Sequence, residues 1–276
     1  MCLIIHELPQ KITSYEELSK VIQEIRSDRF YLNAQNVQEI YRGQANDSWG
    51  LEPNIIRNLK GCSPKKVKKN EKAIITEFKQ QLEIWNLNEH IQTRWTKKGY
   101  HDDWLLIAQA QHYGIPTRFM DWTLNWQIAL YFAVCDSKYD GLDGQFWIYF
   151  SPREILISEN DSSMKHLNSD PFEFNNIALL NASTFYSDNL EKEIAQRRKM
   201  CQNGKFLIQP YETIYIPLEE QEYFNKNLHK IIIPSDCKEA MRKELDNYHI
   251  NYNTVMIKTI TEIDAIVKDL QTKYKL

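Results

Sequence analysis

Helical patterns dominate the first half of this chain, and the short strand patterns among and after them do not alternate regularly with helices. A doubly wound parallel sheet needs that alternation, so the order of elements favours an α+β fold instead. We expect a helical N-terminal part packed on a small mixed or antiparallel sheet. The 276 residues are enough to bury a large core, as one domain or as one domain with an added lobe.

Capping residues and apolar spacing mark the expected helices. Ser14 and Glu17 form a capping box ahead of apolar residues at helical spacing, which predicts a helix over 14–27. Ser63 and Pro64 supply a cap and a first-turn proline for a helix over 64–87, whose first lysines, Lys65 to Lys69, are expected to be solvated. Further helices are expected from 102 towards Gly114, over 125–134, near 236–247 and near 259–270.

Runs of β-branched and aromatic residues mark the expected strands. We predict strands over 37–42, ended by Gly43, and over 145–150, with shorter strands at 205–208 and 230–233. Residues 158–190 are rich in Asn, Ser and Asp, so they are expected to be irregular.

Composition excludes several classes of protein. A net charge of −3 gives no overall basic field of the kind that attracts nucleic acid or anionic lipid. Five scattered cysteines without a C-x-x-C pair argue against a disulfide framework and a structural zinc site, so we expect no metal and a reducing, cytoplasmic setting. No apolar run is long enough to span a membrane, and the N-terminus has no signal-peptide pattern.

The first candidate binding segment contains Tyr41, Arg42 and Gly43. Arg42 ends a predicted strand just before a glycine, where backbone crowding is expected to be low. A planar, always-charged guanidinium suits a phosphate or a carboxylate. Taken alone, an arginine in such a place is more often a structural or surface residue.

The second candidate segment runs from Gln111 to Thr123 and places His112, Arg118 and Asp121 beside a glycine and a proline. Gly114 and Pro116 predict a sharp turn from helix to strand. Alternation after the turn predicts two faces, with Thr117, Phe119 and Asp121 on one and Arg118, Met120 and Trp122 on the other.

Each polar residue of the second segment also has a structural explanation. His112 could cap its own helix, Asp121 could cap the following helix, and Arg118 could pair with a remote carboxylate. Three such groups beside bulky aromatics would be a costly way to build a core. The cluster as a whole therefore favours a polar cleft shared with Arg42.

Taken in order, these segments resemble the FRG domain, a family named for its Phe/Tyr-Arg-Gly motif. The resemblance covers roughly residues 37–210 and rests on Tyr41 to Gln44, Leu51 and Pro53 with the following Arg57, Gln111 to Thr123, Ala129 to Ala133, Arg197-Arg198, and Gln202, Gly204 and Phe206. It implies an FRG domain at 31–210, with a helical segment at 1–30 before it. A C-terminal strand and helices at 211–276 would pack on the same domain.

The order of motifs is also similar, more distantly, to the arginine-type ADP-ribosyltransferases. In that family an arginine on a first strand engages NAD phosphates, a second strand carries a hydroxyl-bearing motif, and a later strand brings a catalytic glutamate. The similarity implies an ADP-ribosyltransferase-like core with Arg42, Asp121 to Thr123, and Gln202 in these places. Glutamine lacks the charge that stabilises an oxocarbenium-like centre, so Asp121 or Glu193 would have to substitute.

These resemblances imply a protein that binds NAD or a related nucleotide, with ADP-ribosyltransferase or NAD glycohydrolase activity, in a toxin or phage-defence setting. A macromolecular acceptor would be the second partner, and no membrane is involved. The implied catalytic residues are His112, Asp121 and Gln202, and the implied binding residues are Tyr41, Arg42, Gly43, Thr117, Arg118, Trp122 and Thr123, with Tyr41 or Trp122 stacking on a ring.

Two other chemistries and one other class of function compete with this interpretation. No cysteine stands at a recognisable nucleophile spacing from His112, and nothing in the spacing of His112 and Asp121 requires a metal. The competing class is a non-catalytic recognition module that holds a peptide or a nucleic-acid end in the same cleft. Turnover of NAD separates the module from the enzyme.

Overall fold

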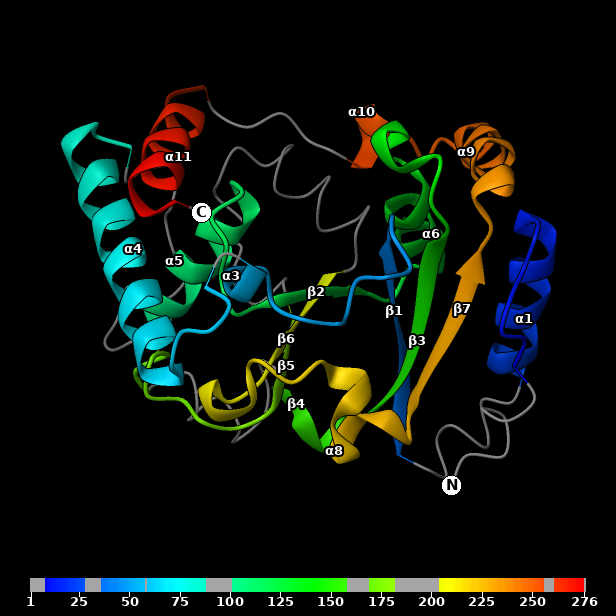
Figure 1. Cartoon of the computed structure of the whole chain (residues 1–276), viewed down its shortest axis with the longest axis horizontal. Coiled ribbons are helices and arrows are strands. Elements are labelled where there is room, and N and C mark those ends of the chain that lie inside the picture. The colour runs from blue at the N-terminus through cyan, green and yellow to red at the C-terminus, as the bar shows by residue number, and fades with distance from the viewer. Residues whose placement is uncertain are drawn as a thin grey trace.

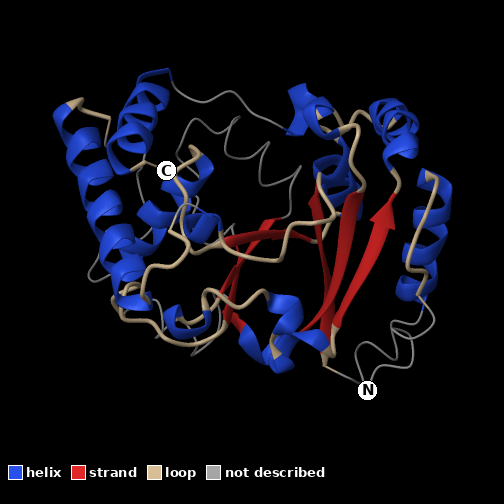
Figure 2. Ribbon diagram, in the orientation of Figure 1, coloured by secondary structure: helices blue, strands red, loops and turns tan. Residues whose placement is uncertain are grey.

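One seven-stranded sheet forms the centre of the molecule, with helices on both sides (Figure 2). The computed structural model describes residues 8–27, 36–57, 59–87, 101–157, 169–181, 204–255 and 261–275. The strand order is β4-β5-β6-β2-β1-β3-β7, and every pairing is antiparallel except the parallel pair β4–β5. This mixed sheet with packed helices confirms the α+β fold class.

The strands are short, and the sheet has two halves that meet at β1 and β2. They are β1 (Val37–Gln44), β2 (Met120–Thr123), β3 (Gly144–Pro152), β4 (Leu156–Ile157), β5 (Ala178–Asn181), β6 (Gly204–Ile208) and β7 (Leu228–Ile233). β1 pairs with β3 along its whole length but with β2 only at Tyr41 and Thr123. Figure 1 shows β2 crossing the direction of β1, β3 and β7, so the two halves of the sheet diverge beyond that single pair.

Three helices cover one face of the β1-β3-β7 half (Figure 1). They are α1 (Tyr15–Ser27), α6 (Trp126–Val134) and α9 (Lys238–Asn247). Ser14 accepts a hydrogen bond from the Glu17 amide, as the capping box predicts. Asn125 caps α6 by accepting from the Gln127 amide at 3.0 Å, so Asp121 is not the cap of this helix.

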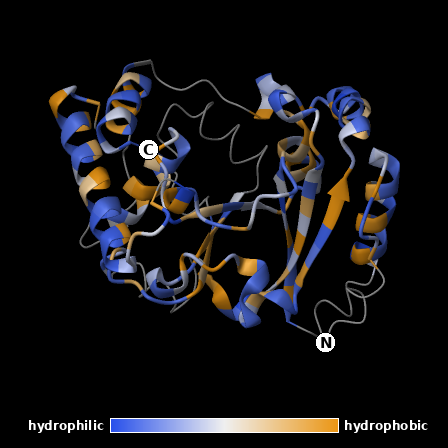
Figure 3. Cartoon of the chain, in the orientation of Figure 1, coloured by the Kyte–Doolittle hydropathy of each residue, from blue (hydrophilic) through white to orange (hydrophobic). Residues whose placement is uncertain are grey.

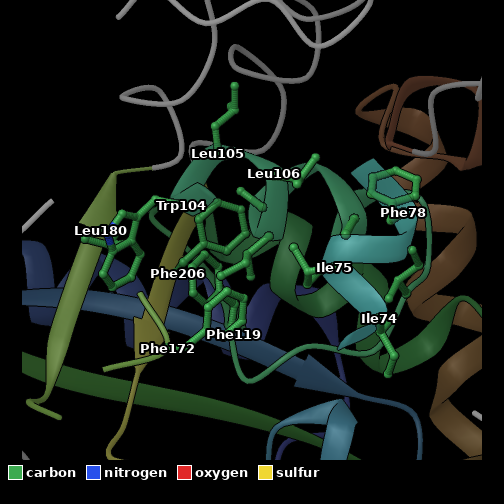
Figure 4. Close-up of a cluster of buried hydrophobic side chains, with 14 of the residues drawn as sticks. Ile74, Ile75, Phe78, Trp104, Leu105, Leu106, Phe119, Phe172, Leu180 and Phe206 are labelled. Atoms are coloured by element: carbon green, nitrogen blue, oxygen red, sulfur yellow. The ribbon is translucent and has the colours of Figure 1, made fainter. Parts of the chain in front are cut away.

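The other half of the sheet packs under α4 (Pro64–Ile84), α5 (His101–His112) and α11 (Thr261–Tyr274). Trp104 of α5 lies at the centre of this core, with its ring 6.0 Å from Phe119 and 5.2 Å from Phe174 (Figure 4). Hydrophobic and hydrophilic residues alternate along α4 and α1 (Figure 3), which is typical of helices with one buried face.

A third layer lies over the opposite face of the sheet. It contains α3 (Asn54–Arg57) and α8 (Glu222–Asn225) together with short 3₁₀ turns. α10 (Tyr252–Val255) is not part of this layer, because its Val255 packs in the core shared by α1, α6 and α9. Leu51, Leu218 and Phe224 from this layer pack on Trp122 and Tyr149 of the sheet. The sheet is therefore buried on both faces around the β1–β2 junction.

Several predicted boundaries are wrong for identifiable reasons. β1 continues through Gly43 to Gln44 because both residues still pair with β3. The segment 158–190, predicted to be irregular, contains β5 at Ala178–Asn181, a four-residue strand that its polar surroundings hide. The rest of that segment, apart from 169–177, lies outside the described residues.

The described residues contain neither a membrane-spanning helix nor a cluster of metal ligands. None of their helices is long and apolar enough to cross a membrane. Among the same residues, no three His, Cys, Asp or Glu side chains gather in a way that could hold a metal ion.

Candidate functional site

A cavity of about 690 Å³ opens where the two halves of the sheet diverge. Residues from β1, β2 and β6 form its floor, and α3, α5 and α6 contribute to its walls. Arg42, His112 and Asp121 all line it. The structure therefore brings together the two sequence segments that we expected to share a cleft, although they are far apart in the chain.

Gly43 brings α6 directly against β1. A Cβ atom at this position would lie 1.8 Å from the carbonyl oxygen of Ala129 and 2.7 Å from the nitrogen of Ala133. Both are backbone atoms of α6, so only a glycine allows this approach. The expectation of low crowding around Gly43 is wrong, because its missing side chain accommodates a helix and does not open space for Arg42.

Arg42 bridges the gap between the diverging strands. Its Nη1 donates to the main-chain oxygen of Asp121, where β1 and β2 no longer pair, and its Nε is buried without a hydrogen-bond partner. Burial lowers the pKa of Arg42, the attraction of Asp121 opposes this, and Arg57 lowers the pKa further. A guanidinium stays charged at neutral pH, so Arg42 presents a cation with spare donors to the cavity.

Asp121 is held in place by a chain of side chains that begins in the turn after α5. Thr117 donates its hydroxyl to Gln111 Oε1, and Gln111 Nε2 donates to Asp121 Oδ2 at 2.8 Å. Thr117 is fully buried and does not line the cavity, so it positions Gln111 and does not contact a ligand.

The Asp121 carboxylate is accessible from the cavity but poorly hydrated. The side chain is exposed on the cavity side, while protein atoms surround it elsewhere. Burial accordingly raises its pKa above the ordinary value, and Arg42 and the Gln111 hydrogen bond oppose the rise. Because Asp121 is accessible from the cavity, a ligand can reach its carboxylate. Because protein atoms surround the carboxylate elsewhere, its charge would interact strongly with a charged group of that ligand.

His112 is the last residue of α5 and lines the cavity. The helix ends in a Schellman motif, in which the Ile115 amide donates to Ala110 O and the Gly114 amide donates to Gln111 O, both at 2.9 Å. Gly114 has a φ of +94°, which explains the glycine at this position. The turn fixes where His112 and Gln111 meet the cavity.

Arg118 does not line the cleft, contrary to our expectation. Its side chain is 0% exposed and donates to the carbonyl oxygens of Phe174 and Pro171, and its guanidinium lies 4.4 Å from the centre of the Tyr211 ring. Its amide donates to the buried carboxylate of Glu71 at 2.7 Å. Arg118 therefore connects the turn after α5 to α4 and to the loop before β5, and its role is structural.

Tyr41 and Trp122 have rings that pack inside the core. Tyr41 is 0% exposed with its ring 5.8 Å from Phe146, and Trp122 is 2% exposed with its ring 5.8 Å from Tyr149. Neither offers an open ring face, so the structure does not support the stacking expected of them. Thr123 lines the cavity and also accepts a hydrogen bond from the Asn125 amide at 3.0 Å.

The sequence patterns missed Trp49 and Tyr139, which form an aromatic and basic wall of the cavity together with Arg57. The Arg57 guanidinium lies 4.8 Å from the centre of the Trp49 ring, and Trp49 meets Tyr139 edge-on at 5.0 Å. These residues come from separate loops and α3, and no short motif links them. The exposed Arg57 follows the FRG-like motif in the sequence, which is the only signal that pointed to it.

The sequence patterns also missed Lys205 of β6. Lys205 is 4% exposed, lines the cavity and donates from Nζ to Asn181 Oδ1 at 2.9 Å. Burial lowers its pKa to about 8. The sequence predicts only that Lys205 lies in a strand. The residues next to a lysine in a strand do not indicate whether its side chain is buried. Gln202 and Glu193, which were expected nearby, lie outside the described residues.

One family model matches part of the chain. Residues 37–141 match the FRG domain family. No curated protein and no solved structure matches the chain, so the likeness to ADP-ribosyltransferases stays a prediction. The match includes Arg42, His112, Asp121 and the wall at Trp49, Arg57 and Tyr139, and thus most of the cavity lining. The cavity is therefore lined mainly by residues of the segment that matches the FRG domain model.

Proposed function

We propose that the cavity binds NAD or a related nucleotide, with Arg42 holding the phosphates. The observation that carries the proposal is that the Arg42 guanidinium lines the cavity and, among the described contacts, donates only from Nη1, to the main-chain oxygen of Asp121. Burial of its charge lowers the pKa of Arg42, so an anionic ligand that accepts from the remaining terminal donors would be stabilising there. A phosphate matches both the charge and the forked shape of the guanidinium.

A second cation strengthens the choice of a phosphate-bearing ligand. Arg57 lies close enough to Arg42 to lower its pKa, so the free protein holds two like charges on one side of the cavity. A diphosphate would neutralise both. Two acidic residues, Asp121 and Asp136, line the same cavity, but neither forms an ion pair with Arg42 or Arg57 among the described contacts.

The size and lining of the cavity suit a nucleotide. Its volume of about 690 Å³ lies within the usual range for small-molecule sites. Trp49 and Tyr139 supply aromatic surface beside Arg57, and they replace Tyr41 and Trp122 as the candidates for contact with a base.

Two of the three expected motifs lie on neighbouring strands. β1 carries Arg42 and β2 carries Asp121, whereas Gln202 lies outside the described residues. Asp121 is the acid that we assign to the oxocarbenium-like centre, where its ionised form would stabilise positive charge as the nicotinamide bond breaks. His112 lines the same cavity and could move a proton to or from the acceptor.

Direct binding tests the proposal. Isothermal titration of the native protein with NAD should give saturable binding that weakens as salt is added, because phosphate contacts with Arg42 and Arg57 are electrostatic. Adenosine, which lacks phosphates, is the matched control and should bind much more weakly. Absence of a binding heat for NAD at several temperatures would end the nucleotide proposal.

Asp121→Asn should abolish most of any NAD turnover while leaving NAD binding intact. Asparagine keeps the size and can still accept the Gln111 hydrogen bond, but it lacks the charge, so release of nicotinamide should slow by about 10²- to 10³-fold. Chromatography of free nicotinamide measures the rate. Asp136→Asn is the control, because Asp136 lines the same cavity but caps a 3₁₀ turn through the Lys138 amide. An unchanged rate in Asp121→Asn would remove the catalytic role.

The pKa of Asp121 sets the pH dependence of that turnover. Burial raises this pKa, so the active, ionised form is lost as the pH falls through a value above the ordinary one for aspartate. Activity that depends on Asp121 should therefore rise with pH on the acid side. Asp121→Asn should flatten that limb of the profile.

A non-catalytic binding module is the second candidate function. No glutamate lines the described part of the cavity, and the carboxylate that does line it has a raised pKa. The module would hold a peptide or a nucleic-acid end in the cavity and would not consume NAD. Release of free nicotinamide from NAD separates the two, because a transferase and a glycohydrolase both produce it and a module does not. Mass spectrometry of a lysate incubated with the protein and NAD then finds ADP-ribose on a macromolecular acceptor only for a transferase. A role as a toxin or phage-defence effector in the cytoplasm goes with the catalytic function, because an enzyme that depletes NAD harms the cell.

A further inference from the structure

Lys205 is a buried cation on the cavity floor without an acidic partner among the described residues. Its only polar contact there is with Asn181 Oδ1, a neutral amide oxygen. An ammonium has three donors, so two remain available, and its charge is uncompensated in a site with little water. A buried charge of this kind indicates an anion that binds from the cavity.

Asn181 completes a small site for that anion. It lines the cavity beside Lys205, and its Oδ1 accepts from the lysine. This hydrogen bond fixes the orientation of the amide, so Nδ2 can donate to a second oxygen of the same ligand. The register sets Asn181 directly opposite Lys205, which keeps the two side chains on one face of the sheet.

The head group of Lys205 lies apart from that of Arg42. Arg42 reaches to the main chain of β2, whereas Lys205 reaches to a side chain of β5. β6 lies between these two strands, so their backbones are two interstrand spacings apart, on the order of 10 Å. The proposed diphosphate is held by Arg42 and Arg57, which leaves Lys205 for a separate anionic group.

We propose that the natural ligand carries a phosphate monoester, separate from its diphosphate, that binds Lys205 and Asn181. The inference rests on the proposed nucleotide function and narrows it. The substrate class becomes nucleotides with a diphosphate and an additional terminal phosphate, and NADP is the dinucleotide of this class that differs from NAD by that one group.

If Lys205 serves to bind an anion, its buried charge should lower the free energy of unfolding of the ligand-free protein. Burial lowers the pKa of Lys205 to about 8 from 10.5, so the folded state is penalised for holding the charge below about pH 8. That penalty is relieved as the pH rises towards 10.5. Lys205→Met should therefore fold and be more stable than the native protein at pH 7, which urea denaturation would show.

The test compares NAD and NADP by isothermal titration. At pH 7 the native protein should bind NADP about ten- to a hundredfold more tightly than NAD, the range expected for one charge-assisted contact. In Lys205→Met the preference should vanish while NAD binding is retained. Lys205→Arg, which keeps the charge, should retain much of the preference.

The pH dependence provides a second measurement. The native preference for NADP should fall between pH 7 and 9.5 as Lys205 loses its proton, and it should persist in Lys205→Arg. The phosphate monoester is already doubly charged over this range. The variant also controls for the other charged or titratable groups that line the cavity, which are Tyr41, Arg42, Arg57, His112, Asp121, Cys135, Asp136 and Tyr139.

Each outcome decides one of the two proposals. Equal affinity of the native protein for NAD and NADP, or a preference that survives in Lys205→Met, would overturn the phosphate site and leave the nucleotide function standing. If neither dinucleotide binds, inorganic phosphate becomes the probe. Protection from heat by phosphate in the native protein but not in Lys205→Met would keep the site without the nucleotide, and no protection would overturn both.

Discussion

Gly43→Ala is expected to lower the free energy of unfolding by about 4 kcal/mol or more, which is in the exceptional range for one substitution. The new methyl group would lie 1.8 Å from Ala129 O and 2.7 Å from Ala133 N. Neither contact can be relieved by a side-chain rotation, because both atoms belong to the backbone of α6. The helix would have to move away from β1, and the cavity wall that α6 supplies would move with it.

A second glycine provides the matched control for this prediction. A methyl group added to the Cα of Gly141 would have no atom within 4 Å, and this residue does not have a positive φ. Gly141→Ala should therefore change the free energy of unfolding by less than about 0.5 kcal/mol. Urea denaturation followed by circular dichroism measures both variants. Equal midpoints for the two variants would show that the close approach of α6 to β1 does not exist in solution.

Arg42→Ala is expected to weaken NAD binding by about ten- to a hundredfold. The substitution removes the cation that lines the cavity together with its terminal donors, and hydrogen bonds to charged groups contribute about 1.5–3 kcal/mol each. Arg42→Lys should recover part of the loss, because it restores the charge without the fork. Titration calorimetry gives both affinities.

A control separates the loss of this particular cation from a general loss of charge. Arg153 is exposed and does not line the cavity, so Arg153→Ala removes the same charge elsewhere and should leave NAD binding unchanged. Arg42→Ala also removes the partner of the Asp121 main-chain oxygen, so its stability must be measured beside its affinity. An affinity equal to that of the native protein would show that Arg42 serves only to join β1 to β2.

The helices were predictable because their signals are local. Ser14, Ser63 and Asn125 are caps whose partners lie within three residues, and the Gly114 turn needs only its own helix. The convergence of Arg42 with His112 and Asp121 was predictable for a different reason. Polar groups of this density beside bulky aromatics are difficult to place in a core, so a shared cavity was the economical explanation.

The roles of individual residues were less predictable because they depend on distant partners. Arg118 looks like a ligand-binding arginine in the sequence, yet Phe174, Pro171 and Tyr211 enclose it from segments some fifty to ninety residues away. Lys205 looks like a solvated strand residue, yet β5 and the cavity floor bury it. Burial is set by the packing of elements, and the sequence near each residue contains no record of that packing.

The cavity originates in the sheet itself. β1 and β2 pair at one position and then diverge, and the divergence leaves main-chain groups and a hollow at the centre of the fold. Arg42 satisfies one of those groups and keeps donors for a ligand. The same hollow collects Asp121, Lys205 and the wall at Arg57, so a pocket with several cations arises from one break in strand pairing.

A crystal structure of the native protein soaked with NAD tests this account most directly. We predict that the diphosphate lies within hydrogen-bond distance of the Arg42 guanidinium, with the nicotinamide ribose against Asp121. Soaking with NADP should place its additional phosphate at Lys205. Electron density for the nucleotide outside the cavity, or an empty cavity in crystals soaked at saturating concentration, would contradict the account.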